Sequence, residues 1–396
     1  MSNVREVVVV SGVRTAIGGY GGALKDVPPS ELAAQVVREA VRRAAIDAEQ
    51  IGALALGNVI HTEAKDMYLS RVAGINGGLP RETPAFTVNR LCGSGLQAIV
   101  SAAQSIALGD ADAAIGGGAE SMSRGGYLLP SLRWGQRMNE ATAVDMMVGA
   151  LTDPFETTHM GITAENIAAQ WKISRAEQDA FAVESHRRAV YAIEKGHFKE
   201  QILPIELKTR KGTTLFDTDE HPRADASLEG LAKLRAVFKK DGTVTAGNAS
   251  GINDGAAAVV LMEKSTAEKQ GLKPMARLVS YGIAGVDPAL MGIGPVPAST
   301  RALAKAGLKA DDMDVIESNE AFAVQALAVA CDLKLDPRKT NPNGGAVALG
   351  HPIGATGAIL TVKALYELQR IGGRYALVTM CIGGGQGIAA VFERPQ

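Results

Sequence analysis

Residues 92–108 read CGSGLQAIVSAAQSIAL, a cysteine and a Gly-Ser-Gly turn followed by an alanine-rich apolar run. The run is apolar on nearly every side, and a helix without a polar face is buried. It therefore predicts a helix at the centre of the molecule. The small residues put Cys92 near the helix N-terminus, where unpaired backbone N–H groups favour a thiolate over a thiol. A thiolate is a nucleophile, but a buried structural cysteine fits the local sequence equally well.

The same pattern recurs 262 residues later, where Thr356 and Gly357 correspond to Ser94 and Gly95 and open a second apolar run. At this offset, four pairs of positions also match ahead of an apolar strand in each copy: Ile46 and Leu308, Ala48 and Ala310, Ile51 and Met313, Leu54 and Ile316. We infer that the chain contains a duplication.

Two further likenesses support the duplication. The opening strands 9–12 and 278–282 are similar, and helix-like segments at 30–45 and 298–306 follow them. After the second helix the offset grows by a few residues, which aligns the triple glycine of 116–118 with that of 383–385.

Helix and strand patterns alternate in each copy, which predicts an α/β fold. We expect layers in the order α-β-α-β-α, with two mixed sheets around the central buried helices. Residues 120–246 have no counterpart in the second copy and are more polar, so they predict an inserted loop domain. The N-terminal half would then comprise 1–119 and 247–271, and the C-terminal half 272–396.

Composition excludes several classes of function. The 396 residues carry a formal net charge of −1, which gives no electrostatic reason to expect nucleic acid or an anionic membrane. No apolar run approaches the ~20 residues of a membrane span, and the N-terminus lacks a signal-peptide pattern. Three widely spaced cysteines argue against a disulfide framework and fit a reducing cytoplasm. Cys331, in an alanine-rich helical run, is expected to be buried.

The duplication also makes a prediction about chemistry. Cys92 and His351 both precede the N-termini of equivalent helices, and Cys381 ends the C-terminal strand pattern at 375–380. Helix starts and strand ends are where α/β sheets bind ligands. The three residues suggest a thiol nucleophile with an acid/base partner, although a loop histidine satisfied by backbone is the alternative for His351.

Metal and dinucleotide sites fit the sequence less well. Neither of these cysteines has a second ligand at a short metal-type spacing, so we expect no metal. The glycine run at 383–387 leads into a strand pattern at 388–392, whereas a dinucleotide fingerprint needs a helix there. Glycines beside Cys381 instead suggest backbone N–H groups offered to an oxyanion.

The chain resembles the thiolase family over essentially its whole length. The resemblance rests on six blocks: VNRLCGSGLQA at 88–98, GGAESM at 117–122, GNASG at 247–251, NEAF at 319–322, GGAVALGHPIGATG at 344–357 and CIGGGQG at 381–387. Among thiolases it is similar to the bacterial biosynthetic acetyl-CoA acetyltransferases and β-ketothiolases. One departure is Ser318, where the family more usually has alanine.

The resemblance implies a reversible condensation of two acyl-CoA molecules, such as two acetyl-CoA giving acetoacetyl-CoA and coenzyme A. Cys92 would carry the acyl group as a thioester, His351 would act as its base, and Cys381 would remove the α-proton of the second acetyl-CoA. One oxyanion site would consist of the N–H groups of Cys92 and Gly383. The other would be His351 with a water held by Asn319, for which a structural turn amide is the alternative.

The resemblance further implies coenzyme A thioesters as substrates, with no permanently bound cofactor. The residues expected to contact coenzyme A or the acyl chain are Ser250, His159, Met160, Phe322, Met291, Arg223, Leu234 and Phe238. It also implies a cytoplasmic homotetramer, a dimer of dimers, with residues 127–154 as a tetramer contact. Core packing of the apolar stretch 144–151 fits equally well.

Two alternatives remain at this point. Decarboxylating β-ketoacyl synthases share the duplicated fold but pair a cysteine with two histidines, whereas the third position here is Cys381. A non-catalytic acyl-CoA or lipid carrier would need none of the three reactive residues.

Overall fold

The computed structural model describes residues 5–209 and 212–395; the first four residues, about whose signal-peptide pattern the sequence makes a prediction, lie outside this range. The first half of the chain forms the elements β1 (Val7–Thr15), β2 (Gly18–Gly19), α1 (Pro29–Ala44), η1 (Ala48–Gln50), β3 (Ile51–Gly57), η2 (Ala64–Tyr68), α2 (Leu69–Gly77), β4 (Ala85–Val88), α3 (Ser94–Leu108), β5 (Ala113–Ser121), and later β11 (Asn253–Glu263) and α8 (Lys264–Lys269). The second half forms β12 (Ala276–Gly285), η5 (Pro288–Ile293), α9 (Pro295–Ala306), η6 (Ala310–Asp312), β13 (Val315–Ser318), α10 (Ala323–Leu333), α11 (Ala346–Leu349), α12 (Thr356–Ile371), β14 (Tyr375–Ile382) and β15 (Gln386–Glu393).

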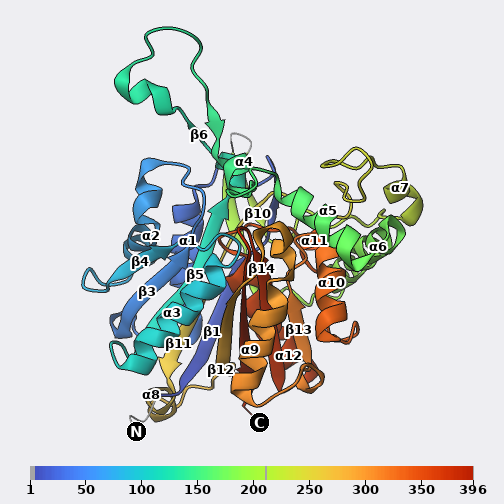
Figure 1. Cartoon of the computed structure of the whole chain (residues 1–396). Helices are drawn as coiled ribbons and strands as arrows, with labels where there is room; N and C mark the ends of the chain where they lie inside the picture. Colours follow the sequence, from blue (N-terminus) through green and yellow to red (C-terminus); the bar gives the residue numbers. More distant parts are fainter. Residues whose placement is uncertain (1–4, 210–211, 396) are drawn as a thin grey trace.

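The long strands join in the order β13-β14-β15-β12-β1-β11-β5-β3-β4 (Figure 1). The junction between β12 and β1 consists of two residue pairs, Val8 with Arg277 and Val9 with Ala276. The strands form one continuous sheet of eleven strands, which also includes β2 and β8, rather than the two separate sheets that the sequence predicted. Each half contributes a mixed part, and this narrow junction joins the two parts. In both, a parallel pair, β3–β5 or β13–β14, continues into antiparallel neighbours. This confirms the predicted α/β fold with mixed strand pairing.

The duplication is visible in matching details of the two opening strands. Strand β1 has an irregularity in register between Val9 and Ser11, and β12 has one between Leu278 and Ser280. In both, the serine after the irregularity donates a hydrogen bond of 2.6 Å to a backbone oxygen of the next helix in the chain, α1 or α9. The same bulge and the same hydroxyl contact recur because both copies pack a helix against the first strand in the same way.

The alignment of the two triple glycines is wrong. Residues 116–118 lie inside β5, whereas 383–385 form the turn between β14 and β15. A Cβ on Gly116 would lie 2.5 Å from the Cα of Ile99 in α3. The first run therefore lets a helix approach the sheet closely, and the second closes a hairpin.

Helices α3 and α12 pack against each other, and α12 contacts strands of both halves, among them β11 and β14. On β1, the Ser11 side chain faces α1, whereas the neighbouring Gly12 faces Val362 of α12, so α1 and α12 cover opposite faces. The segment Leu91–Leu108 is long and apolar enough to cross a membrane by length and composition, contrary to the expectation from the sequence, and 56% of it is buried inside the protein.

The segment between the two parts of the first half, residues 122–252, lies mostly above the strands in Figure 1. Its elements are η3 (Met122–Arg124), β6 (Tyr127–Leu128), η4 (Pro130–Trp134), β7 (Val144–Asp145), α4 (Met146–Ala150), α5 (Met160–Trp171), α6 (Arg175–Glu194), β8 (Ile202–Leu203), β9 (Ile205–Thr209), β10 (Gly212–Phe216) and α7 (Leu228–Ala232). Helix α10 of the second half packs against α5 and α6. Cys331, predicted to be buried, is exposed near the C-terminal end of α10.

Candidate active site

Cys92 lies in a strained turn between β4 and α3. Leu91 adopts a left-handed backbone conformation with φ of 44°, which costs a non-glycine residue on the order of 1–3 kcal/mol. The side chain of Asn89 accepts the Leu91 N–H at 3.0 Å, and the Ser94 hydroxyl accepts the Arg90 N–H at 2.8 Å and donates to Leu91 O at 2.6 Å. These contacts hold the turn and fix Cys92 ahead of the helix.

Burial raises the pKa of the Cys92 thiol to about 11, although the backbone N–H groups of Gly383 and Cys92 oppose this shift. The backbone N–H groups favour the thiolate, as the sequence predicted, but loss of solvation outweighs them. Cys92 is a thiol at neutral pH, and it needs a base to become a nucleophile.

His351 supplies a base whose orientation is fixed. Its Nδ1 lies 2.6 Å from the Thr356 hydroxyl, which donates its own proton to Pro352 O at 2.9 Å. The hydroxyl therefore accepts from Nδ1–H, and this assigns the basic lone pair to Nε2. Burial lowers the pKa of His351 to about 4, so the imidazole is neutral at pH 7.

Asn319 approaches the basic nitrogen of His351. Its Nδ2 lies 3.4 Å from Nε2. The Oδ1 of Asn319 is buried and has no hydrogen-bond partner among the described residues. This amide therefore keeps an acceptor available beside the imidazole.

The loop that carries His351 belongs to the second half but is inserted into the first. A Cβ on Gly57 or Gly118 would lie 2.5 or 2.2 Å from Gly354 O, so only glycines at both positions leave room for this carbonyl. The Glu120 carboxylate accepts the Gly354 N–H at 2.8 Å, together with N–H groups of residues 58–60. Burial raises the pKa of Glu120 to about 8. Gly57, Gly118 and Glu120 thus form a cage around Gly354. This cage holds the loop that carries His351 on the side of the molecule that carries Cys92.

Cys381 and Gly383 lie where β14 turns into β15. Cys381 is fully buried and pairs with Gly387 across the hairpin. Gly384 and Gly385 have φ of 80° and 85°, a conformation that favours glycine in the turn. Burial, together with the neighbouring Cys92, raises the pKa of the Cys381 thiol well above its usual range. The two sulfur atoms therefore belong to one electrostatic environment.

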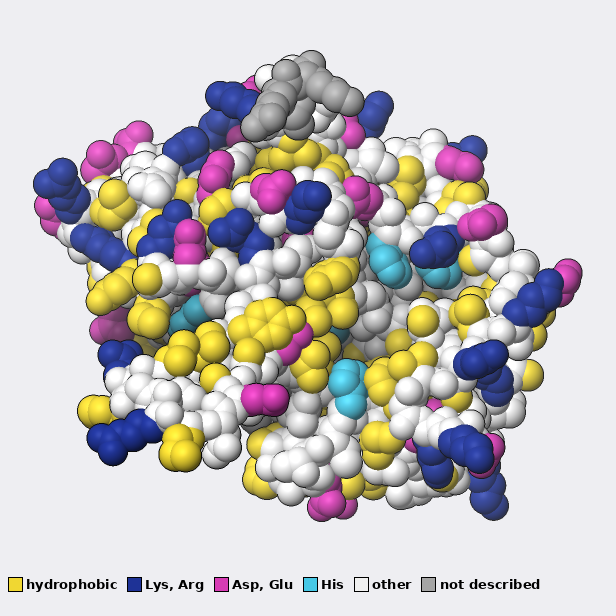
Figure 2. Space-filling view, turned by 90° about the horizontal axis from the view of Figure 1, so that it is seen from above, with side chains coloured by type: hydrophobic (Ala, Val, Ile, Leu, Met, Phe, Trp, Pro, Cys, Tyr) yellow, Lys and Arg dark blue, Asp and Glu magenta, His cyan; other side chains and the backbone are white. Residues whose placement is uncertain are grey.

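A cavity of about 470 Å³ opens over these residues. Figure 2 shows histidine and apolar side chains around a depression in the face that is uppermost in Figure 1. The predicted residues that line the cavity are Cys92, His351, Cys381, Gly383, Ser250, His159, Met160, Phe238, Phe322 and Met291. Residues distant in sequence thus converge on one space.

The loop domain contributes an aromatic wall to this cavity. His159 caps α5 by accepting the Gly161 N–H at Nδ1, and its ring stacks on Phe238 at 4.5 Å. Phe322 meets Phe238 edge to face at 6.3 Å. An apolar chain bound here would be shielded from water on this side.

Three of the predicted site residues lie outside the cavity wall. Asn319 lies behind His351. Leu234 is partly exposed, and its side chain lies against Gly247. Arg223 is exposed and lines a separate hollow with Arg187 of α6.

Sequence reasoning also missed residues that the structure places at the site. Tyr20 and His221 line the cavity, and Thr356 holds the tautomer of His351. Tyr20 and His221 belong to no quoted block, so only the fold brings them here. Thr356 does carry a signal, because it stands opposite Ser94 in the duplication and five residues after His351.

Metal chemistry finds no support in the part of the chain that the structure describes, where no group of three His, Cys, Asp or Glu side chains could hold an ion. The site instead combines two thiols, one neutral imidazole and converging backbone N–H groups. Such a set can form a thioester on one sulfur and move a proton with the other.

The comparisons with known proteins agree with this chemistry. Family models described as "Thiolase, N-terminal domain" and "Thiolase, C-terminal domain" match residues 7–265 and 272–394. The chain is 67% identical over 391 residues to the beta-ketothiolase BktB of Cupriavidus necator, which covers 98% of this chain and 99% of that protein. It is 52% identical over 394 residues to an acetyl-CoA acetyltransferase of Syntrophomonas wolfei, with 98% and 99% covered. The solved structure of human mitochondrial 3-ketoacyl-CoA thiolase in complex with CoA superposes with a TM-score of 0.96 at 45% identity, covering 99% of this chain and 98% of that one.

Proposed function

Because the chain belongs to the thiolase family, we propose that its cavity catalyses the reversible condensation of two acyl-CoA molecules, with Cys92, His351 and Cys381 as the reacting residues. The enzyme is an acyltransferase, and acetyl-CoA with acetoacetyl-CoA is the substrate pair that we assign to it. The observation that carries the proposal is the convergence of two thiols and a neutral imidazole on one cavity.

The first half-reaction transfers the acyl group. His351 takes the proton of the Cys92 thiol at Nε2 as the sulfur attacks the thioester carbonyl. The carbon–sulfur bond to coenzyme A breaks, and Cys381 gives its proton to the departing sulfur. The raised pKa of Cys381 keeps this residue a thiol, so its proton is available for the departing sulfur. The N–H groups of Cys92 and Gly383 stabilise the developing oxyanion.

The second half-reaction forms the carbon–carbon bond. The Cys381 thiolate removes an α-proton from acetyl-CoA, and the resulting carbanion attacks the acyl group on Cys92. The β-ketoacyl-CoA leaves, and the His351 imidazolium returns its proton to the Cys92 sulfur. His351 and a water held by the free acceptor of Asn319 would stabilise the enolate oxygen. All protons balance, with two acetyl-CoA giving acetoacetyl-CoA and coenzyme A.

Coenzyme A would enter along the loop domain. Ser250 and Met160 line the cavity that its pantetheine would occupy, and Phe238 and Phe322 provide the aromatic wall. Arg223 and Leu234 would act farther out, where the nucleotide end reaches the surface. Met291 lines the cavity beside Met160, so we assign chain-length preference to these side chains. One methylene is worth only ~1–3 kcal/mol there.

The quaternary structure that we propose is a homotetramer, with residues 127–154 as a contact between copies. This segment projects away from the main sheet (Figure 1). Its Trp134 and Met138 are 90% and 80% exposed in the single chain. Sedimentation of the protein and of a Trp134→Glu variant tests this proposal, because a tetramer held elsewhere would survive the substitution. Three free cysteines also suit the reducing cytoplasm that we propose.

Absorbance and mass spectrometry test the proposed reaction. The protein is incubated with acetoacetyl-CoA and free coenzyme A, and the loss of the β-ketoacyl absorbance is followed. With acetyl-CoA, we expect Cys92→Ala to abolish the acetyl mass shift. Cys381→Ala should still acquire the acetyl mass, because coenzyme A can leave as its thiolate, but it should lose carbon–carbon bond formation and thiolysis of acetoacetyl-CoA. Cys331→Ala, at an exposed position, is the matched control, and this variant should keep both the acetyl mass shift and thiolysis. Binding of acetyl-CoA without thiolysis would support the carrier instead, and equal loss of both steps in both variants would refute the division of roles. Rates across acyl-CoA lengths then measure the preference.

A further inference from the structure

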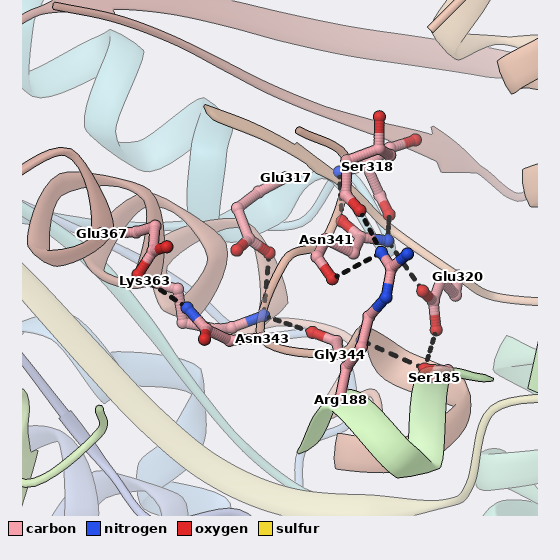
Figure 3. Close-up of polar contacts among 12 residues, drawn as sticks. Ser185, Arg188, Glu317, Ser318, Glu320, Asn341, Asn343, Gly344, Lys363 and Glu367 are labelled. Atoms are coloured by element: carbon pink, nitrogen blue, oxygen red, sulfur yellow. Dashed lines mark hydrogen bonds and ion pairs between the residues drawn. The ribbon is translucent and has the colours of Figure 1, made fainter. Parts of the chain in front are cut away.

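The segment that carries Asn319 continues directly from β13, and the Asn319 N–H donates to Thr379 O of β14 at 3.0 Å. A buried polar cluster around Ser318 and Glu320 holds the segment in addition (Figure 3). Asn341 accepts the Ser318 N–H at 2.9 Å and donates to Ser318 O at 2.8 Å. One side chain thus satisfies both backbone groups of the residue before Asn319. Asn341 has φ of 44°, so the surrounding contacts hold it in a conformation that a non-glycine residue rarely adopts.

Glu320, the residue after Asn319, extends the same cluster. Its Oε1 accepts the Asn341 Nδ2–H at 2.8 Å, and its Oε2 accepts the Ser185 hydroxyl at 2.7 Å and the Val347 N–H at 3.2 Å. Ser185 lies in α6 of the loop domain and Val347 in α11. Figure 3 shows the glutamate between Asn341 and Ser185.

The Val347 contact reaches the segment that leads to His351, because α11 ends two residues before the imidazole. A Cβ on Gly345 would lie 2.1 Å from the carboxyl carbon of Glu320. Glycine is therefore required for α11 to start this close to the carboxylate. Glu320 joins the two segments that bring Asn319 and His351 together.

We propose that Glu320 and Asn341 are positioning residues that hold the Asn319 amide against Nε2 of His351 for the carbon–carbon step. This rests on the proposed function, in which Asn319 serves the enolate oxygen and takes no part in acylation of Cys92. Disturbing the cluster should therefore slow carbon–carbon bond formation and cleavage selectively. A merely structural role would slow both half-reactions together.

Glu320→Gln is the first variant. The NH₂ of an amide at this position would face the Asn341 N–H in one orientation and the Val347 N–H in the other, so one pair of donors is opposed whichever way it is turned. Exchange of isotope-labelled coenzyme A into acetyl-CoA reports acyl transfer alone, and thiolysis of acetoacetyl-CoA adds the carbon–carbon step. We expect exchange to stay within about threefold of the unaltered enzyme. We expect kcat for thiolysis to fall about 10- to 100-fold, part of the ~10²–10³ that loss of an oxyanion donor costs, with a smaller change in KM.

Ser185→Ala and Glu367→Gln complete the set. Ser185→Ala removes one donor to Glu320 with little change in volume, and it decides the question if Glu320→Gln does not fold. Its thiolysis should fall about three- to tenfold with exchange unchanged. Glu367 is another buried carboxylate, and it contacts Asn343 and Arg370 rather than Glu320 or Asn341, so Glu367→Gln should leave both rates within about twofold.

The outcomes separate the two proposals. Absence of thiolysis in the unaltered enzyme overturns the proposed function before any variant is compared. If the unaltered enzyme is active, an equal fall of exchange and thiolysis in the folded Glu320 variant overturns the positioning role. Unchanged thiolysis in the folded Glu320 variant also overturns the positioning role. If Glu320→Gln does not fold, unchanged thiolysis in Ser185→Ala overturns it.

Discussion

The Thr356 hydroxyl accepts the Nδ1 proton of His351 across 2.6 Å and gives its own proton to Pro352 O at 2.9 Å. The helix that begins at Thr356 therefore fixes the tautomer of the imidazole that precedes it. Because Nδ1 is committed to this contact, Nε2 is the nitrogen that takes a proton from substrate or thiol. A neutral hydroxyl performs the orienting role that a carboxylate performs in many hydrolases.

Replacing Thr356 with valine should slow acyl transfer. Valine keeps the shape but removes the acceptor, so the imidazole loses its fixed orientation and tautomer. General base catalysis contributes ~10²–10⁴, and we expect kcat/KM for coenzyme A exchange to fall about 10- to 100-fold. Thr356→Ser retains the hydroxyl and should stay within about threefold. If valine and serine variants exchange coenzyme A equally fast, the hydroxyl has no orienting role.

Stability should decrease as the pH falls from about 6.5 to about 4. Burial lowers the pKa of His351 to about 4, so the unfolded chain binds this proton while the folded chain does not. The contribution of the neutral His351 to the free energy of unfolding is complete above the ordinary pKa of 6.5 and is lost progressively below it. The loss amounts to about 3 kcal/mol near pH 4. Urea unfolding at pH 7, 5.5 and 4 measures the effect. His351→Gln lacks this titration and should lose less stability over the same interval; an identical loss in both proteins would contradict the assignment.

The sequence predicted that Cys92, His351 and Cys381 meet at one cavity because each stands at a helix start or a strand end, and the duplication places those ends on one side. Ser94 and Thr356 open α3 and α12 at the predicted offset. Burial of the central helices followed from their lack of a polar face. These features are local, or they repeat, and a single sequence displays them.

What the sequence did not predict depends on contacts between distant segments. The left-handed conformation of Leu91 could not be predicted, because the position is not a glycine. The raised pKa of Cys92 depends on how much protein covers the sulfur, which a sequence does not show. His221 reaches the cavity from a loop outside every quoted block. Cys331 was predicted to be buried from its alanine-rich helix, but helices have two faces and this residue lies on the exposed one.

Asp219→Asn should destabilise the protein strongly. Arg14 and Asp219 form a bidentate ion pair, and both side chains are fully buried. Nη1 donates to Oδ1 at 2.7 Å and Nη2 donates to Oδ2 at 2.9 Å. Removing the negative charge leaves the guanidinium buried without its counter-ion, which costs about 3–5 kcal/mol. Urea unfolding at pH 7 measures the loss. The exposed pair of Lys233 and Glu229 provides the control, because Glu229→Gln should change stability by less than about 0.5 kcal/mol. A loss below about 1 kcal/mol in the Asp219 variant would contradict the prediction.

Gly118→Ala should impair both stability and catalysis. The added Cβ would lie 2.2 Å from Gly354 O, a backbone atom that cannot turn aside as a side chain can. The loop that carries His351 must therefore move away from β5, at a cost of about 1–3 kcal/mol or more for overpacking. We expect the midpoint of urea unfolding to fall and coenzyme A exchange to slow at least tenfold, because the imidazole that lines the cavity together with Cys92 is displaced. Gly126→Ala is the matched control, since nothing lies within 4 Å of its added methyl group and its φ is not in the left-handed region. Full exchange activity in a destabilised Gly118 variant would mean that the loop can shift without moving the imidazole, and the cage would then serve stability alone.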